Sequence, residues 1–250
     1  MTKKLTMCET FYSIQGEGPT VGVPSVFLRL SGCNLTCGGL NTIKTKELDN
    51  GATWRCDTIE TWLKKDKKTP EEIINSWEES GWLSHIENGA HIIITGGEPL
   101  LQDRALSEFL EYLNSQLKSS PYIEIETNGT IQPSKPLDSR VTHYNISPKL
   151  VNSGMSLEVR YKPSVLKWFS QSQKSYFKFV SDNESELNEI KRLFISPFNI
   201  KNSKIWLMPA ASTRGQLIEK GRIIAEICQK EGLNMGQRLH IMLWDQTVGV

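Results

Sequence analysis

The sequence predicts an α/β fold, an incomplete (β/α) barrel, and two features of the 250-residue chain lead to this prediction. Short apolar segments rich in β-branched and aromatic residues alternate with amphipathic segments of helical period. This order is typical of a mostly parallel sheet covered by helices. Roughly six strand–helix units are visible, whereas a complete barrel has about eight. No low-complexity linker or internal repeat divides the chain, so we expect one domain over residues 1–250.

Seven short segments have the composition of strands. They are residues 25–30 (SVFLRL), 91–95 (HIIIT), 122–126 (YIEIE), 143–146 (HYNI), 176–180 (YFKFV), 205–208 (IWLM) and 239–244 (LHIMLW). In parallel α/β folds the functional side chains collect in loops after the carboxyl ends of strands. The loops that follow the first four segments are therefore the first places to look for chemistry.

Helical patterns lie between these strands. Thr69 is followed by Pro70 and, three residues on, by Glu72, which is the pattern of a capping box. Apolar side chains recur at helical spacing within residues 101–117, 187–194 and 223–228. We expect these stripes to pack against the sheet as core.

The composition limits the classes of partner and compartment. Lys and Arg total 29 against 28 for Asp and Glu, a balance that provides no basic field for nucleic acid. The N-terminus has no apolar stretch typical of a signal peptide, and no long apolar run could span a membrane. We therefore expect a cytoplasmic protein, where clustered cysteines are more often metal ligands or redox groups than disulfides.

Three of the five cysteines follow the first predicted strand: Cys33, Cys37 and Cys56. Three thiolates can hold a zinc ion with a fourth ligand, or three irons of a cubane iron–sulfur cluster. The cluster would leave its fourth iron open to a small chelating molecule. Zinc ligands usually come in CxxC pairs, which this chain lacks. Buried small hydrophobic thiols remain the alternative.

The segment GCNLTC at residues 32–37, followed by CDT at residues 56–58, resembles the cluster loop of radical S-adenosylmethionine enzymes. More narrowly, it resembles that of the 7-carboxy-7-deazaguanine synthases. The resemblance implies a radical S-adenosylmethionine type of barrel with a 4Fe–4S cluster on Cys33, Cys37 and Cys56. The family has a short gap before its last cysteine, so we interpret residues 38–55 as an inserted loop, which adds little closure entropy. The longer gap leaves open whether Cys37 or Cys8 completes the cluster.

Other motifs match the same family in order along most of the chain. The segment FYSIQGEG at residues 11–18 resembles the part of the family that holds its pterin substrate. The resemblance implies substrate contacts from Ile14, Gln15, Gly16, Glu17, Arg29, Thr95 and His240. By residue type alone, Arg29 could instead pair with a protein acid, and His240 could be a core residue of the last predicted strand.

Three segments that follow predicted strands resemble the family's S-adenosylmethionine site: GGEP, ETNGT and SPK. The implied cofactor contacts are Gly97, Glu98, Asn128, Ser147, Pro148, Lys149 and Lys178. Asn128 could also serve a simple Asn-Gly turn, and Lys178 could be a solvated strand lysine. The resemblance also implies that Thr58 binds Mg²⁺, an ion that prefers oxygen ligands, whereas capping of the next helix is the structural alternative.

The resemblance implies a reaction of queuosine-type biosynthesis. 6-Carboxy-5,6,7,8-tetrahydropterin would become 7-carboxy-7-deazaguanine with loss of ammonia, after a 5′-deoxyadenosyl radical removes hydrogen from C6. It further implies a homodimer and an electron donor such as flavodoxin or ferredoxin. Two rival hypotheses remain: a radical S-adenosylmethionine enzyme of other specificity, such as a glycyl-radical activator, and a non-enzymatic zinc-binding module.

Overall fold

The computed structural model describes residues 3–245 and residue 247, and its centre is a nine-stranded sheet of order β3-β1-β2-β4-β5-β6-β7-β8-β9. The strands are β1 Leu5–Ile14, β2 Pro24–Leu30, β3 Asp66–Lys68, β4 His91–Gly96, β5 Ile123–Thr127, β6 His143–Ile146, β7 Ser175–Val180, β8 Ile205–Met208 and β9 Asn234–Met235. From β2 to β9 neighbouring strands are parallel, whereas β1 is antiparallel to β2 and β3. The sheet ends at β3 and β9 without closing, so the predicted incomplete barrel is confirmed.

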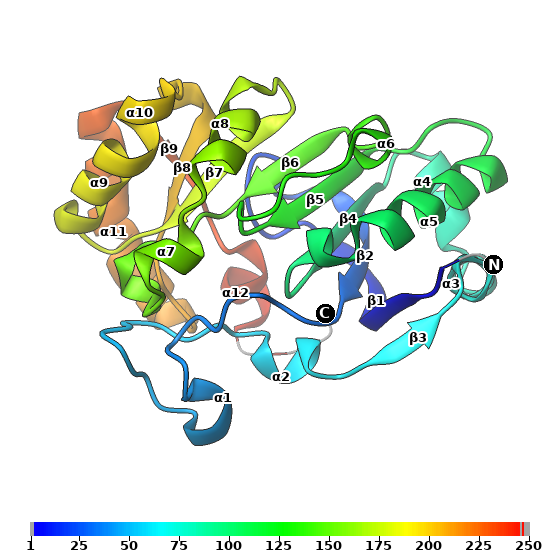
Figure 1. Ribbon diagram of the computed structural model, residues 1–250, viewed down its shortest axis with the longest axis horizontal. Helices are drawn as coiled ribbons and strands as arrows, with labels where there is room; N and C mark the ends of the chain where they lie inside the picture. The colour runs from blue at the N-terminus through cyan, green and yellow to red at the C-terminus, as the bar shows by residue number, and fades with distance from the viewer. Residues whose placement is uncertain (1–2, 246, 248–250) are drawn as a thin grey trace.

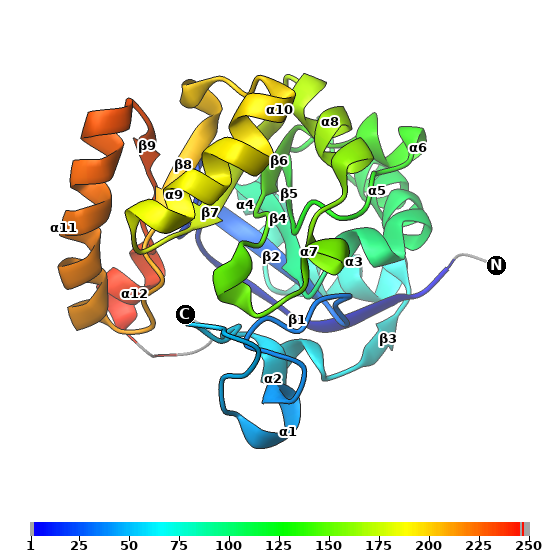
Figure 2. The same cartoon turned by 60° about the vertical axis from the view of Figure 1, so that its left-hand side comes forward.

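Most of the helices surround the outer face of this curved sheet (Figures 1 and 2). They are α1 Thr42–Thr45, α2 Ile59–Trp62, α3 Pro70–Glu79, α4 Trp82–Glu87, α5 Asp103–Gln116, α6 Lys135–Asp138, α7 Leu157–Arg160, α8 Pro163–Gln171, α9 Glu184–Ile190, α10 Ser196–Phe198, α11 Arg214–Glu231 and α12 Leu239–Trp244. Short 3₁₀ turns lie at Pro99–Gln102, Val151–Ser153 and Asn202–Lys204, and a π-helical turn at Lys191–Ile195. None of the helices described is long and apolar enough to cross a membrane.

The alternation of side chains along each strand separates an apolar outer face from a polar inner face. Ile94 and Ile125 belong to the main core, together with Phe109 of helix α5. The intervening Glu124 and Glu126 point the other way, into the barrel, where they align with residues of β6. The interior of this barrel is therefore polar at the level where a ligand would bind.

The capping box predicted from Thr69 is confirmed. The Thr69 hydroxyl accepts a hydrogen bond from the Glu72 N–H at 3.2 Å, and the Glu72 carboxylate accepts from the Thr69 N–H at 2.7 Å. Two members of the predicted apolar stripes are not core residues, because Leu101 and Ile223 are about half exposed, at 49% and 48%.

Six of the seven predicted strands are confirmed, and the prediction for residues 239–244 is wrong. That segment is helix α12, which packs Ile241 against Ala211 and Leu217. A short run that is apolar on every side has no period of two or of 3.6, so its sequence does not separate strand from helix. The first strand, β1, has mostly half-buried side chains and was not predicted.

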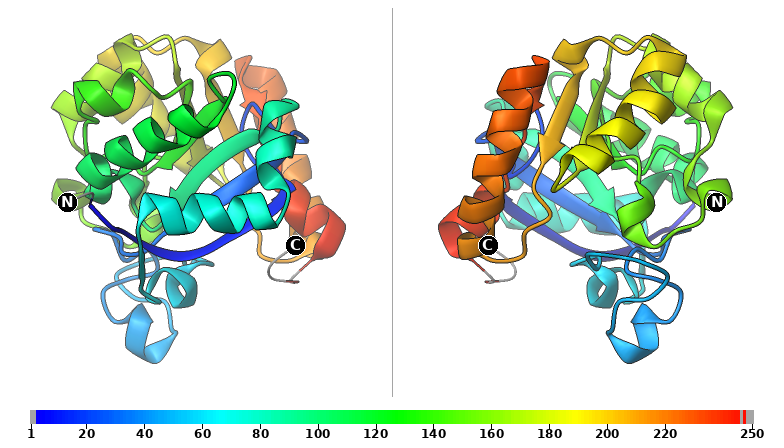
Figure 3. Two further views of the ribbon diagram at one scale, coloured as in Figure 1. Left: turned by 90° about the vertical axis from the view of Figure 1, so that its right-hand side faces the viewer. Right: turned by 90° about the vertical axis from the view of Figure 1, so that its left-hand side faces the viewer.

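Residues 38–55 project from one end of the barrel as a separate segment. Both views of Figure 3 show this segment in light blue, below the rest of the molecule. Its two ends stay together, because the Cys56 N–H donates to the Cys37 carbonyl at 3.1 Å. The projection is also fastened to the turn Val151–Ser153 by the N–H groups of Gly38 and Thr53, each 2.9 Å from a carbonyl oxygen of that turn. The segment between Cys37 and Cys56 therefore folds back on itself, and these two cysteines lie side by side.

Candidate active site

The three cysteines of the loop after β2 come together at the carboxyl end of the barrel. Cys33, Cys37 and Cys56 pack in one small cluster with Leu35, Met155 and Trp54. Cys8 lies on β1 instead, where its Sγ is 3.4 Å from the Ser31 hydroxyl. Cys37 therefore joins the other two thiols, which answers the question that the long gap left open.

The chemistry of the groups around these thiols fits a bound iron–sulfur cluster. Burial raises the pKa of Cys33 to about 11 and that of Cys37 to about 12, so a thiolate here needs a metal to replace its proton. Trp54 Nε1 is buried with no hydrogen-bond partner in the described chain. A donor left over beside three sulfurs suits a ligand that carries acceptor atoms. Within the described residues, no three His, Cys, Asp or Glu side chains are grouped as a site for a single metal ion.

The glycine turn after β4 lies directly against the cysteine loop. A Cβ on Gly97 would lie 2.0 Å from the Gly32 oxygen and 2.9 Å from Cys33 Cβ, so only glycine allows the turn to touch the cysteine loop. Glu98 is fully buried, and its carboxylate accepts from the Thr127 hydroxyl at 2.9 Å and the Asn128 N–H at 2.7 Å. Glu98 therefore joins the turn to the end of β5.

Residues at the ends of β5 and β6 approach the same loop. Asn128 Nδ2 donates to Asn34 in the cysteine loop at 2.8 Å and lies 4.0 Å from Cys33 Sγ. After β6, Lys149 Nζ donates to the Ser147 hydroxyl at 3.0 Å and lies 5.7 Å from the centre of the Trp54 ring. Pro148 stands between these two residues. Six of the seven predicted cofactor residues therefore lie in the loops that follow β4, β5 and β6: Gly97, Glu98, Asn128, Ser147, Pro148 and Lys149.

Lys178, the seventh, lies in the barrel interior and pairs with Glu17, so the alternative of a solvated lysine is wrong. Glu17 also accepts from Arg238 Nε at 2.9 Å, and Arg238 in turn pairs with Asp57 beside Thr58. Burial alone would raise the pKa of Glu17, but Lys178 and Arg238 outweigh it and lower the pKa. Glu17 is therefore an ionised carboxylate that links the loop after β1 to the cysteine loop.

Gln15 and Thr95 meet at a pair of glutamates on β5. Gln15 Nε2 lies 3.0 Å from Glu124 Oε1 and 3.4 Å from Glu126 Oε1. The Thr95 hydroxyl donates to the other oxygen of Glu126 at 2.7 Å. This group lies on the inner face of the sheet and presents carboxylate oxygens and an amide to the interior.

His240 reaches the same region from α12. The Leu239 N–H donates to the Gly16 carbonyl at 2.8 Å, and a Cβ on Gly16 would lie 2.3 Å from His240 Nδ1. Burial lowers the pKa of His240, which favours the neutral imidazole. His240 therefore lies against Gly16 in the loop after β1, near the other predicted substrate residues, although it was predicted on a strand and lies on a helix.

The remaining predicted residues have individual outcomes. Arg29 pairs with Glu9 at 2.8 Å, which is the alternative that the sequence left open, but it lies beside Thr95 in the register of β2 and β4. Ile14 ends β1 at the start of the loop that carries Gln15. Thr58 precedes α2 without capping it through its side chain, and its hydroxyl lies 3.4 Å from Cys56 Sγ.

Four polar residues of this site were not predicted from the sequence: Arg238, Asp57, Glu124 and Glu126. For the two glutamates a signal existed, because the segment IEIET alternates with period two and so places both carboxylates on one face of a buried strand. For Arg238 and Asp57 no local pattern indicated the pairing, since it joins segments distant in the sequence.

An open parallel barrel with three thiols beside a glycine turn at its carboxyl end is the arrangement of the radical S-adenosylmethionine enzymes. A family model described as "4Fe-4S single cluster domain" matches residues 14–132, which include all three cysteines. A 7-carboxy-7-deazaguanine synthase from Pyrobaculum aerophilum is 32% identical over 99% of this chain and 98% of its own length. One from Halobacterium salinarum is 30% identical over 97% of this chain and 91% of its own. The chain belongs to the 7-carboxy-7-deazaguanine synthase family.

A crystal structure of QueE from Escherichia coli has the same fold. It superimposes with a TM-score of 0.63 over 95% of each chain, at 22% sequence identity. The expected radical S-adenosylmethionine barrel and 4Fe–4S cluster are thereby confirmed, and neither the zinc-binding module nor another specificity is favoured.

Proposed function

We propose that this protein converts 6-carboxy-5,6,7,8-tetrahydropterin to 7-carboxy-7-deazaguanine and ammonia. The observation that carries the proposal is the group of three thiols beside a polar barrel interior, in a chain 32% identical over nearly its whole length to a synthase of that name. When bound, the 4Fe–4S cluster and S-adenosylmethionine supply the 5′-deoxyadenosyl radical that starts the reaction at C6. The protein's own residues bind, orient and shield.

For the cofactor, Cys33, Cys37 and Cys56 would hold three irons of the cluster, and S-adenosylmethionine would bind the fourth. The backbone at Gly97, together with Ser147, Pro148 and Lys149, lies around the thiols and would bind the methionine and nucleoside parts. Glu98 and Asn128 act by fixing these loops, since their polar atoms are already bonded to neighbouring protein groups.

For the substrate, the inner face of the barrel provides groups that complement a carboxylated pterin. The amino and N–H groups of a pterin are donors, and Glu17 and Glu126 are half-buried carboxylates able to accept from them. Arg29 is a partner for the substrate carboxylate, with Gln15, Gly16, Ile14, Thr95 and His240 around the ring. Mg²⁺ on the Thr58 hydroxyl would bind the same carboxylate, in keeping with its preference for oxygen.

The reaction requires an electron from outside, and we propose a small one-electron carrier such as a flavodoxin or a ferredoxin as its source. We further propose a cytoplasmic homodimer of single-domain subunits, in which residues 38–55 are an insertion in the cluster loop. These features rest on the family resemblance, and the near-zero net charge favours no nucleic-acid partner.

Two cysteine variants provide the sharpest test of the function. The protein is reconstituted anaerobically with iron and sulfide and incubated with S-adenosylmethionine, Mg²⁺, a reductant and the pterin. We expect 5′-deoxyadenosine and 7-carboxy-7-deazaguanine from the wild type and from Cys8→Ala, and neither from Cys37→Ala. If 5′-deoxyadenosine forms without the deazaguanine, the proposed substrate is wrong but the radical chemistry is supported. If a zinc-loaded protein forms neither, the radical chemistry is wrong.

A further inference from the structure

The loop that joins β1 to β2, residues 15–23, lies against the inner face of the barrel. Its neck is closed by the Gln15 N–H, which donates to Val23 O at 2.8 Å, and by the Gly22 N–H, which donates to Gln15 O at 2.8 Å. At its tip a Cβ on Gly18 would lie 2.3 Å from Asn145 Nδ2 on β6. This loop carries three of the residues assigned to the substrate, so whatever fixes the loop also fixes them.

Glu124 on β5 holds this loop at two separate points. Its Oε1 accepts from Gln15 Nε2 at 3.0 Å, at the neck, and its Oε2 accepts from the Thr20 hydroxyl at 2.5 Å, beyond the tip. Asn145 Nδ2 adds a weaker contact at 3.4 Å. Glu124 is 0% exposed, and no Lys or Arg of the described chain donates a hydrogen bond to it. It is therefore a buried acid whose direct partners are neutral, two of them on the loop.

The groups around Glu124 favour a neutral carboxyl. Glu126 lies next along its strand, His143 is its register partner on β6, and Lys178 on β7 is already paired with Glu17. Burial, followed by the charge of Glu126, raises the pKa of Glu124 to about 7. Asn145 Oδ1 is buried and has no partner in the described residues; half a turn of the amide would bring it to face Glu124 as an acceptor.

We propose that Glu124 is a positioning residue for the pterin: it clamps the neck and the far side of the loop to β5, and thereby holds Gln15 and Glu17 at the substrate. The proposal rests on the function proposed above, because that function makes this loop the substrate loop. Glu124 need not touch the pterin. Both the protonated and the ionised carboxyl group of Glu124 have an oxygen that can accept from Gln15 Nε2. A glutamine side chain, which has the same shape and also has an oxygen, should therefore replace Glu124.

The test compares Glu124→Ala, Glu124→Gln and Glu186→Ala. Glu186 is a buried glutamate on α9, away from the barrel interior, whose carboxylate accepts a backbone N–H, so it controls for the loss of a buried acid. In Glu124→Ala we expect KM for the pterin to rise roughly tenfold or more, as loss of hydrogen bonds to a buried acid predicts. Glu124→Gln should restore most of the affinity.

A second measurement follows the loop without using activity. Glu17 is the glutamate in the loop, and a glutamyl endopeptidase should cleave after it faster in Glu124→Ala than in the wild type or in Glu186→Ala. If Glu124→Ala is cleaved at the wild-type rate, or has the wild-type KM for the pterin, the proposed clamp is wrong. An equal rise of KM in Glu186→Ala would also contradict it. Faster cleavage in a protein whose wild type makes no deazaguanine would support the clamp and reject the function.

Discussion

At the scale of single residues, the site depends on charges that are buried and compensated. Glu17, Lys178 and Arg238 are held in the interior, where each lone charge would carry a large desolvation cost. The network continues through Arg238 to Asp57, so it also joins the substrate loop to the residue before Thr58. Removal of one member leaves the others uncompensated, and this has a measurable effect on stability.

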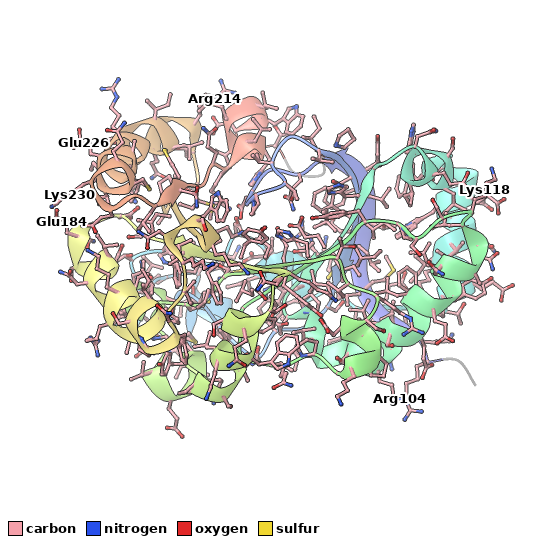
Figure 4. All side chains as sticks on the ribbon, turned by 90° about the horizontal axis from the view of Figure 1, so that it is seen from above. Arg104, Lys118, Glu184, Arg214, Glu226 and Lys230 are labelled. Atoms are coloured by element: carbon pink, nitrogen blue, oxygen red, sulfur yellow. The ribbon has the colours of Figure 1, made fainter. Side chains whose placement is uncertain are left out.

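Lys178→Met should lower the free energy of unfolding by on the order of 3 kcal/mol, because it leaves the buried Glu17 carboxylate without one of its two cations. Lys230→Met is the matched control. Lys230 pairs with Glu184 on the rim of the molecule, where Figure 4 labels both, and its side chain is 66% exposed. We expect no measurable loss of stability there, because water screens an exposed ion pair. Urea unfolding measures the free energy of unfolding of both variants. Equal losses in Lys178→Met and Lys230→Met would contradict a stabilising role for the buried network.

Glu124 should make stability depend on pH. Its pKa is raised from 4.5 to about 7 in the folded protein, so the folded state binds more protons than the unfolded state between these values. The free energy of unfolding therefore falls as pH rises through this window, by about 3 kcal/mol for the full shift. Glu124→Gln cannot ionise and should lose less stability between pH 5 and pH 8. Urea unfolding at both pH values measures this difference, and identical losses would contradict the assignment.

At the scale of elements, the close approach of two loops decides whether the thiols are placed correctly. The turn after β4 touches the cysteine loop through Gly97, where no Cβ fits. Gly97→Ala should displace the cysteine loop and reduce the iron bound after anaerobic reconstitution. Gly215→Ala in α11, where an added Cβ meets nothing within 4 Å, should bind iron as the wild type does. Full iron content in Gly97→Ala would show that the contact can yield.

The projection formed by residues 38–55 adds Trp54 to the thiol pocket. Trp54→Ala would remove packing against the group that contains Cys37, and the approach to Lys149, so a reconstituted cluster should be lost faster to an iron chelator. Leu48→Ala, at an exposed position of the same projection, is the control and should be neutral. The decay of the cluster's visible absorbance measures both, and equal decay rates would exclude a supporting role for Trp54.

How far the elements follow from the sequence depends on their period. The strands at 91–95 and 143–146 are short, contain β-branched or aromatic residues and are followed by polar loops, and these were predictable. Residues 239–244 are apolar on all sides, so only their packing on α11 decides for a helix. The cysteine triad was predictable as a set, but the position of Cys37 rather than Cys8 beside Cys56 depends on how the projection folds back, a long-range property.

At the scale of the whole molecule, the curved sheet brings distant segments to one interior. Glu17 follows β1, Lys178 lies on β7 and Arg238 precedes α12, yet they form one network. Such pairings arise from the topology of the sheet and leave no local pattern, so the family motifs could suggest Glu17 and His240 while Arg238 stayed unnoticed. The fold class and most of the cofactor pocket were thus predictable, and the partners of the buried charges were not.

The most direct measurement is an anaerobic turnover with the pterin substrate deuterated at C6, in which mass spectrometry reads both products. The account predicts 7-carboxy-7-deazaguanine together with deuterium in 5′-deoxyadenosine, because the radical takes its hydrogen from that carbon. Deazaguanine formation with no deuterium in 5′-deoxyadenosine would contradict the proposed start of the reaction. Absence of the deazaguanine from a fully iron-loaded protein would contradict the proposed function itself.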